Sequence, residues 1–152
     1  MMKVKQDVKF NGLGFPVKLI NWPHIEIDGQ LEPDINYELL ADRVFASLPE
    51  KPSQLTGAEI KFIRYKMEMT QAAFAKWLRT VDTSTITKWE AKDLKPTGMG
   101  ADTEYALRLR LIIDKEVKFR RKNIKIDVVN RLLEKKSARK EPMTLDFSEM
   151  RA

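Results

Sequence analysis

Residues 55–96, LTGAEIKFIRYKMEMTQAAFAKWLRTVDTSTITKWEAKDLKP, decide the fold of the larger part of this chain of 152 residues. Thr56 followed three positions later by Glu59 is a capping box, a pattern that starts a helix. Thr70 and Asp82 are suited to cap two further short helices. The stretch therefore predicts three helices, one after Thr56, one over 71–79 and one over 83–92.

A fourth helix is predicted from about Asp102 to Lys118. Its apolar residues recur at helical spacing and form a broad face: Tyr105, Leu107, Leu109, Leu111, Ile112, Ile113 and Val117. Four helices of these lengths, separated by such short breaks, predict one packed helical unit.

The helix predicted over 83–92 concentrates short hydroxyl side chains, at Thr83, Ser84, Thr85 and Thr87. These residues are mediocre helix formers, and a helix that only packs has no reason to prefer them on its exposed side to Ala, Glu or Lys. We therefore expect this side to contact a ligand. The alternative is an amphipathic helix that packs in a bundle and binds nothing.

The same stretch resembles the helix-turn-helix of Xre-type, lambda-repressor-like DNA-binding domains. The positions that match the pattern of that family are Thr70, Gln71, Phe74, Ala75, Val81, Asp82, Thr85, Ile86, Trp89 and Glu90. The resemblance implies that the helix over 83–92 enters the major groove of double-stranded DNA. The family usually turns between these two helices through a glycine, whereas this chain has Arg79-Thr80 there and a turn one residue longer.

Two sets of residues are expected within this motif. Small Ala75 permits close approach of the two helices, while Phe74, Ile86 and Trp89 fill the core between them. The residues expected to contact DNA are Gln71, Thr83, Ser84, Thr87, Lys88, Lys92 and Lys95.

Their chemistry suits different parts of DNA. Hydroxyl groups, a threonine methyl and the Lys88 ammonium suit base edges in the major groove. Gln71 matches the family position that holds a phosphate, and Lys92 and Lys95 are expected to meet the DNA backbone as well. For Arg79 two alternatives stay open, a phosphate contact and a solvated surface side chain.

The N-terminal part predicts a different architecture. From Val4 to Ile27, apolar residues tend to alternate and are interrupted by Asn-Gly, Asn21-Trp22-Pro23 and Asp28-Gly29, which predicts two or three short antiparallel strands. A helix follows over 35–48, with Asp34 as its expected N-cap. The fold class is therefore α+β, a small antiparallel β-rich unit plus a helix, followed by a lambda-repressor-like helical domain.

A polar segment with two prolines, residues 49–54, is the predicted domain boundary. The predicted domains are an N-terminal α+β unit over 1–54, a DNA-binding unit over 55–118, and a basic helix and tail over 119–152. For the short alternating piece around Leu145 and Phe147, a strand and a disordered tail remain alternatives.

Charge is distributed unevenly along the chain. The formal net charge is +6, but residues 1–54 carry −2 and residues 55–152 carry +8. A basic C-terminal part fits a polyanionic partner, although charge alone is a weak indication. The basic cluster Lys118, Arg120, Arg121, Lys122 and Lys125 fits a solvated helix end as well as a nucleic-acid contact.

Several classes of function are not expected. The chain has no cysteine and a single histidine, so we expect no disulfide, no metal site and no cofactor. His24 is expected to be a structural strand residue, because no nucleophile or metal cluster accompanies it. We predict no enzyme activity, no membrane span and a cytoplasmic location.

The expected function is that of a transcriptional repressor that binds DNA as a homodimer, with a seam made by Leu109, Ile113 and Val117 or by a helix over 128–133. The order of parts also resembles that of MqsA-type antitoxins, without the zinc-binding cysteines of that family. The alternative function is therefore an antitoxin whose N-terminal unit neutralises a toxin and whose helical unit autoregulates the operon. An RNA-binding adaptor ranks last, since the aromatic platform and glycine loops of such modules are missing.

Overall fold

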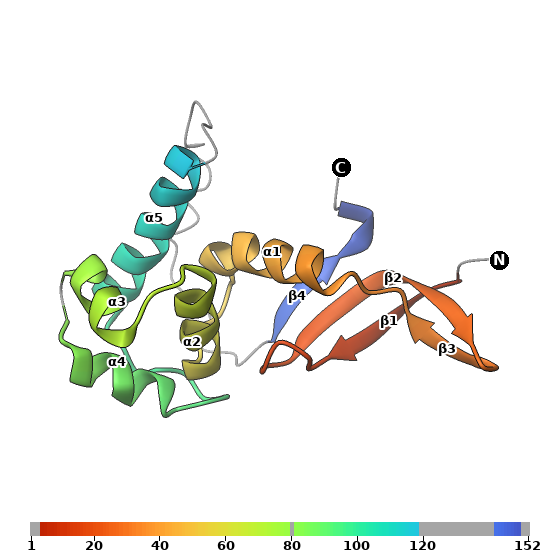
Figure 1. Cartoon of the computed structure of the whole chain (residues 1–152), viewed down its shortest axis with the longest axis horizontal. Coiled ribbons are helices and arrows are strands. Elements are labelled where there is room, and N and C mark those ends of the chain that lie inside the picture. Colours follow the sequence, from red (N-terminus) through yellow and green to blue (C-terminus); the bar gives the residue numbers. More distant parts are fainter. Residues whose placement is uncertain (1–3, 80, 119–141, 150–152) are drawn as a thin grey trace. The chain divides into compact units, whose positions relative to one another are not determined.

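The computed structural model describes residues 4–79, 81–118 and 142–149, and it divides the chain into two compact units (Figure 1). The first unit comprises Met1–Val44 with Pro142–Ala152, and the second comprises Phe45–Glu141. The mixed α+β class is confirmed. The division differs from the predicted one, because residues 45–54 belong to the helical unit and the C-terminal tail returns to the first unit.

A four-stranded sheet forms the first unit, with strands β1 (Val4–Phe10), β2 (Val17–Ile27), β3 (Gln30–Pro33) and β4 (Met143–Asp146). β1 pairs antiparallel with one edge of the long β2. The other edge of β2 is shared, since β4 pairs with its first part and β3 with its last part. β2 is therefore the central strand of the sheet.

The C-terminal tail corrects the expectation of a purely antiparallel unit. β4 pairs parallel with β2, with Met143 beside Val17 and Leu145 beside Leu19. Both Met143 and Leu145 are buried, while Thr144 between them is exposed. The alternation of this piece thus marks a strand, and a parallel partner far along the chain completes the sheet.

The Asn21-Trp22-Pro23 segment corrects a second expectation. The sequence predicts a turn there, but β2 runs through it with a β-bulge opposite Asp7. Asn21 takes a left-handed backbone conformation, φ 53°, and its N–H donates to Asp7 Oδ1 at 2.9 Å. Asn tolerates this conformation, so it serves a bulge here as readily as a turn.

Asp28-Gly29 joins β2 to β3 as a two-residue hairpin turn with both φ angles positive, the type I′ geometry that Asp-Gly favours. β3 itself was not predicted, because only four residues follow the turn before the chain leaves the sheet.

Trp22 is a buried residue of the first unit's core. Its indole N–H donates to the carbonyl of Asp34 at 3.1 Å, and its ring meets Phe147 edge-on, with the centroids 5.4 Å apart. Phe147 belongs to the short 3₁₀ helix η2 (Phe147–Glu149) that follows β4. His24 is buried, and its Nδ1 lies 2.8 Å from the carbonyl oxygen of Trp22.

Helix α1 (Tyr37–Ser47) begins later than predicted. Its capping residue is Asn36, whose Oδ1 accepts the N–H of Leu39 at 3.0 Å. The predicted cap at Asp34 is wrong, because the N–H of Asp34 donates to the carbonyl of Pro23 at 2.9 Å and thereby continues the strand pairing.

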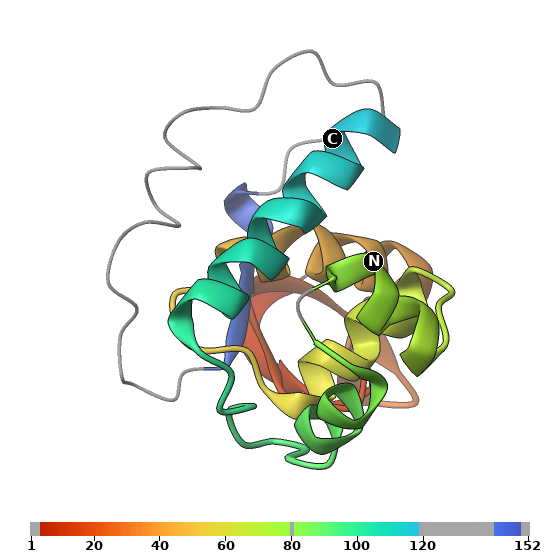
Figure 2. The ribbon, with the colours of Figure 1, turned by 90° about the vertical axis from the view of Figure 1, so that its left-hand side faces the viewer.

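The second unit contains the 3₁₀ helix η1 (Leu48–Glu50) and helices α2 (Gly57–Lys66), α3 (Gln71–Leu78), α4 (Thr83–Glu90) and α5 (Ala101–Lys118) (Figure 2). α4 contacts both α2 and α3, and α5 contacts η1 and α3. The fully buried apolar side chains of these elements are Leu48, Ile60, Ile63, Phe74, Leu78, Ile86 and Leu107. The four helices predicted for this part of the chain are present.

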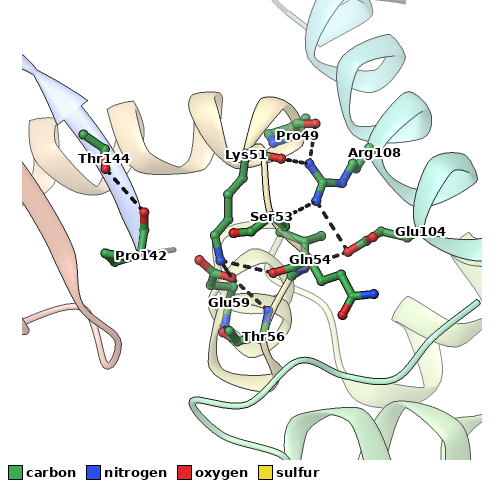
Figure 3. Close-up of polar contacts among 11 residues, drawn as sticks. Pro49, Lys51, Ser53, Gln54, Thr56, Glu59, Glu104, Arg108, Pro142 and Thr144 are labelled. Atoms are coloured by element: carbon green, nitrogen blue, oxygen red, sulfur yellow. Dashed lines mark hydrogen bonds and ion pairs between the residues drawn. The ribbon is translucent and has the colours of Figure 1, made fainter. Parts of the chain in front are cut away.

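Residues 49–54, the predicted boundary, are held inside this unit by the buried side chain of Arg108 on α5 (Figure 3). Its Nη1 donates to the carbonyl oxygens of Pro49, at 3.2 Å, and of Lys51, and its Nη2 donates to that of Ser53 at 2.7 Å. Glu104, one turn earlier, lies 3.4 Å from the same guanidinium. Burial lowers the pKa of Arg108, against the opposing effect of Glu104.

A second buried ion pair adjoins the first (Figure 3). The Nζ of Lys51 donates to Glu59 Oε1 at 2.7 Å and to the carbonyl of Gln54 at 3.2 Å. The same Oε1 accepts the N–H of Thr56 at 2.8 Å, and Thr56 Oγ1 accepts the N–H of Glu59 at 3.2 Å, so the predicted capping box is confirmed. Lys51 is thus buried in this polar segment because its charge has a partner, while Glu50, Pro52 and Gln54 are exposed.

We predict that Arg108→Ala lowers the free energy of unfolding by about 3–5 kcal/mol, because it leaves three inward carbonyls without their donor and the Glu104 carboxylate without its cation. Chemical denaturation with a fixed m-value would measure the change. Lys76→Ala, at an exposed position on α3, serves as control and should change the free energy by no more than about 0.5 kcal/mol. Equal effects of the two substitutions would contradict the role of Arg108.

Candidate nucleic-acid interface

Helix α3 begins as the sequence predicts. Thr70 is its N-cap, and Thr70 Oγ1 accepts the N–H of Ala73 at 3.1 Å. Phe74, Ala75 and Leu78 are buried on the side of α3 that packs in the unit. Gln71, the first residue of the helix, is partly exposed.

Arg79 ends α3 in the left-handed conformation, with φ 69°, and its N–H donates to the carbonyl of Ala75 at 2.9 Å. This is a conformation that glycine adopts without a steric cost and that a side chain adopts at a cost of roughly 1–2 kcal/mol. Arg79 therefore takes the left-handed conformation that glycine usually provides at the end of a helix. Thr80, the second residue of the predicted turn, lies outside the described residues.

Asp82 caps α4, and its carboxylate accepts hydrogen bonds from Ser84 and Thr85. Asp82 Oδ1 accepts the N–H of Thr85 at 2.9 Å, the hydroxyl of Thr85 at 2.8 Å and the hydroxyl of Ser84 at 2.9 Å. These hydrogen bonds, with Thr85 as the main contributor, lower the pKa of Asp82 to about 2. Two of the crowded hydroxyl groups thus stabilise the start of their own helix.

The buried side of α4 consists of Ile86 and Trp89, as predicted. The following Glu90 binds α2 through Arg64, whose Nε and Nη2 donate to the two carboxylate oxygens at 2.9 and 2.8 Å. Arg64 Nη1 also donates to the carbonyl of Met69, at 3.0 Å, in the segment that leads to α3. The hydrogen bond to Glu90 is the main cause that raises the pKa of Arg64.

The role of Arg64 was not predicted. A usable signal existed, since Arg64 follows Ile60 by four positions on the buried side of α2. A charged residue at such a position requires a partner, and Glu90, next to the buried Trp89, is one candidate carboxylate.

The opposite side of α4 is exposed and carries Thr83, Ser84, Thr87 and Lys88. Gln71 of α3 adjoins this side, because the hydroxyl of Thr87 donates to Gln71 Oε1 at 2.8 Å. The structure therefore brings Gln71 of α3 next to Thr87 of α4. Both belong to the residues that the sequence predicts to contact DNA.

Lys92 and Lys95 are exposed on the turn after α4, and the start of α2 holds this turn in place. The N–H groups of Gly57 and Ala58 donate to the carbonyls of Lys95, at 3.2 Å, and Asp93, at 2.8 Å. A Cβ at Gly57 would lie 2.3 Å from the carbonyl oxygen of Trp89, so only glycine permits this approach. The backbone of Lys95 is thus anchored to α2, and its N–H donates to the carbonyl of Lys92 at 3.0 Å, while both lysine side chains are exposed and can reach a polyanion.

The predicted dimer seam is described only in part. Ile113 is 39% exposed on α5 and Leu109 is half-buried. The Val117 side chain and the helix predicted over 128–133 lie outside the described residues. The basic residues 120–125 also lie outside them, and the Lys118 side chain does too.

Two further features are missing from the described ranges of the chain. Among the residues that the structure describes, no group of three or more His, Asp or Glu side chains is placed to hold a metal ion. Within the same ranges, no helix has the length and apolar character needed to cross a membrane. Scans of protein-family models, of curated proteins and of solved structures each gave no match to the chain.

We predict that the Asp82 carboxyl titrates near pH 2 in the folded protein, below its ordinary pKa of 3.8. Because the folded pKa is depressed, its contribution to stability is complete above about pH 3.8 and is lost as the pH falls towards 2. An NMR titration of the carboxyl carbon would give the midpoint.

Thr85→Val removes a donor and should raise the midpoint towards 3.8. Thr87→Val removes a hydroxyl that does not contact Asp82 and should leave the midpoint unchanged. A native midpoint at 3.8 would show that the cap is not formed.

Proposed function

We propose that this chain is a sequence-specific DNA-binding transcriptional regulator, a repressor that reads the major groove with α4 as a homodimer. The observation that carries the proposal is the division of α4 into two sides. Ile86 and Trp89 anchor one side in the helical unit, while short hydroxyls and Lys88 occupy the other.

The dimensions and chemistry of α4 support this role. An α-helix with its side chains is about 10–12 Å across, which fits the major groove of B-DNA. Short side chains such as Thr83 and Ser84 let the helix backbone approach the base edges, and Lys88 offers a donor to guanine. The resemblance to Xre-type domains points in the same direction.

Phosphate contacts would come from the residues around α4. Lys92 and Lys95 extend from the anchored turn after the helix, and Gln71 lies beside it at the start of α3. Such contacts fix the orientation of the protein on DNA, and they make its affinity depend on salt.

A homodimer follows from the small size of one such module. A single recognition helix contacts few base pairs, so useful affinity requires two copies on a pseudo-palindrome. The exposed Ile113 on α5 supports an apolar contact between copies.

In vitro selection from random duplex DNA tests the proposal directly. We predict enrichment of a pseudo-palindrome whose half-sites lie about one helical turn, 10 base pairs, apart. Failure of the purified protein to enrich any sequence would contradict the proposed function.

Variants in the same assay separate the two sets of contacts. Thr83→Ala combined with Lys88→Ala should relax the sequence preference while the fold is retained. Lys92→Ala should weaken binding to all sequences alike and reduce the slope of log affinity against log salt by about 1. A loss confined to one base position in Lys92→Ala would contradict the phosphate assignment.

A second candidate function, that of an antitoxin, is favoured by the β2–β3 hairpin. Ile27 and Leu31 are 49% and 48% exposed there. The acidic Glu26, Asp28 and Glu32 are exposed on the same hairpin. Ile27 and Leu31 lie on opposite faces of the hairpin, and exposed apolar side chains beside carboxylates suit a basic protein partner.

Co-expression tests this candidate wherever a toxin-like reading frame adjoins the gene. An antitoxin should restore growth, and Ile27→Asp with Leu31→Asp should abolish the rescue without changing DNA binding. If the chain is a regulator with no toxin partner, co-expression of the unmodified chain should not restore growth.

A further inference from the structure

The hydroxyl of Thr87 links α4 to α3 and has a choice of acceptors. It lies 2.8 Å from Gln71 Oε1 and 3.1 Å from the carbonyl oxygen of Thr83, one turn earlier in its own helix. A threonine hydroxyl has one proton to donate. Both acceptors are protein atoms, so the proton of this hydroxyl is used within the protein.

The orientation of the Gln71 side chain follows from this contact. A primary amide carries its oxygen and its NH₂ group on opposite sides of the terminal carbon. When Oε1 faces Thr87 and accepts its proton, the NH₂ group faces the other way. Gln71 is partly exposed, and this NH₂ group has no hydrogen-bond partner among the described residues, so it can donate to an acceptor outside the protein.

The same contact limits what Thr87 itself does. The Thr87 side chain is β-branched and has few staggered conformations in a helix. Hydrogen bonds to two acceptors stabilise the conformation that the structure shows. The hydroxyl is therefore committed within the protein and is not free to donate to a base. On the exposed side of α4, Thr87 is therefore hydrogen-bonded to Gln71. Thr83, Ser84 and Lys88 on the same side make no hydrogen bond to Gln71 in the structure.

We propose that Thr87 is a positioning residue, whose hydroxyl holds the Gln71 amide so that its NH₂ group donates to a phosphate oxygen of DNA. Thr87 then donates no hydrogen bond to a base, contrary to its expected place among the base-reading residues. This inference rests on the proposed DNA-binding function and assigns the phosphate contact to a pair of residues from two helices.

Affinity measurements on the selected DNA and on its single-base variants test the proposal. Thr87→Val keeps the shape of the side chain and removes the hydroxyl, and Thr87→Ser keeps the hydroxyl. We expect Thr87→Val to weaken binding to every DNA by the same factor, about three- to tenfold, and Thr87→Ser to bind nearly as the native chain does. In a Gln71→Ala background, Thr87→Val should have no further effect.

A readout without DNA tests the hydrogen bond itself. In the free protein, the side-chain NH₂ resonances of Gln71 should move in Thr87→Val and stay close to their native positions in Thr87→Ser. Thermal unfolding of both variants verifies that α4 is retained.

The possible failures can be told apart. A changed ranking of the single-base variants in Thr87→Val would show that Thr87 reads a base and would overturn the inference. Independent, multiplicative effects of Thr87→Val and Gln71→Ala would overturn it too. Absence of DNA binding by the native chain would instead overturn the proposed function, and the inference with it.

Discussion

The guanidinium of Arg108 fixes the path by which the chain enters its helical unit. Residues 49–53 turn three carbonyl oxygens inward, and buried carbonyls require donors. Arg108 supplies them from α5, more than fifty positions later, through its two terminal nitrogens. Its Nε finds no hydrogen-bond partner among the described residues, so the whole effect lies in those two nitrogens.

The remaining charges of this cluster explain how it tolerates burial. Glu104 lies beside Arg108 and also accepts the N–H of Leu55 at 2.7 Å, while Glu59 neutralises Lys51. Two cations and two carboxylates therefore balance in a region where an unpaired charge would be strongly unfavourable. The start of α2 is fixed as a result, and α2 in turn holds the turn after α4. The placement of the exposed side of α4 thus depends on the buried ion pairs of Arg108 and Lys51, which do not touch that side.

Local patterns in the sequence predicted the helices of this unit and their caps, because Thr56, Thr70 and Asp82 act on N–H groups within three positions. Local patterns failed to predict contacts in which the interacting residue lies far along the chain. A polar segment with two prolines is typical of a linker, and nothing local in it reveals Arg108. Similarly, the residues near Val17 do not indicate that Met143 pairs with it in a parallel arrangement. Asn21 illustrates a third limit, since one backbone conformation serves both a turn and a bulge.

The candidate interface was predictable to a similar degree. Helical spacing separates Ile86 and Trp89 from the hydroxyl-bearing side of α4, and the structure has this division. Spacing could not tell how those hydroxyls are used. Ser84 donates to the cap and Thr87 donates to Gln71, so two of the expected base-reading side chains already have acceptors within the protein. That distinction arises from the packing of α3 against α4.

The most direct test of the proposed interface is NMR mapping of the isotopically labelled full chain with its selected duplex DNA. The account predicts that the largest shift changes fall on Thr83, Ser84 and Lys88, on the side chain of Gln71, and on the turn that carries Lys92 and Lys95. Changes confined to the strands of the first unit, with α4 unaffected, would contradict it.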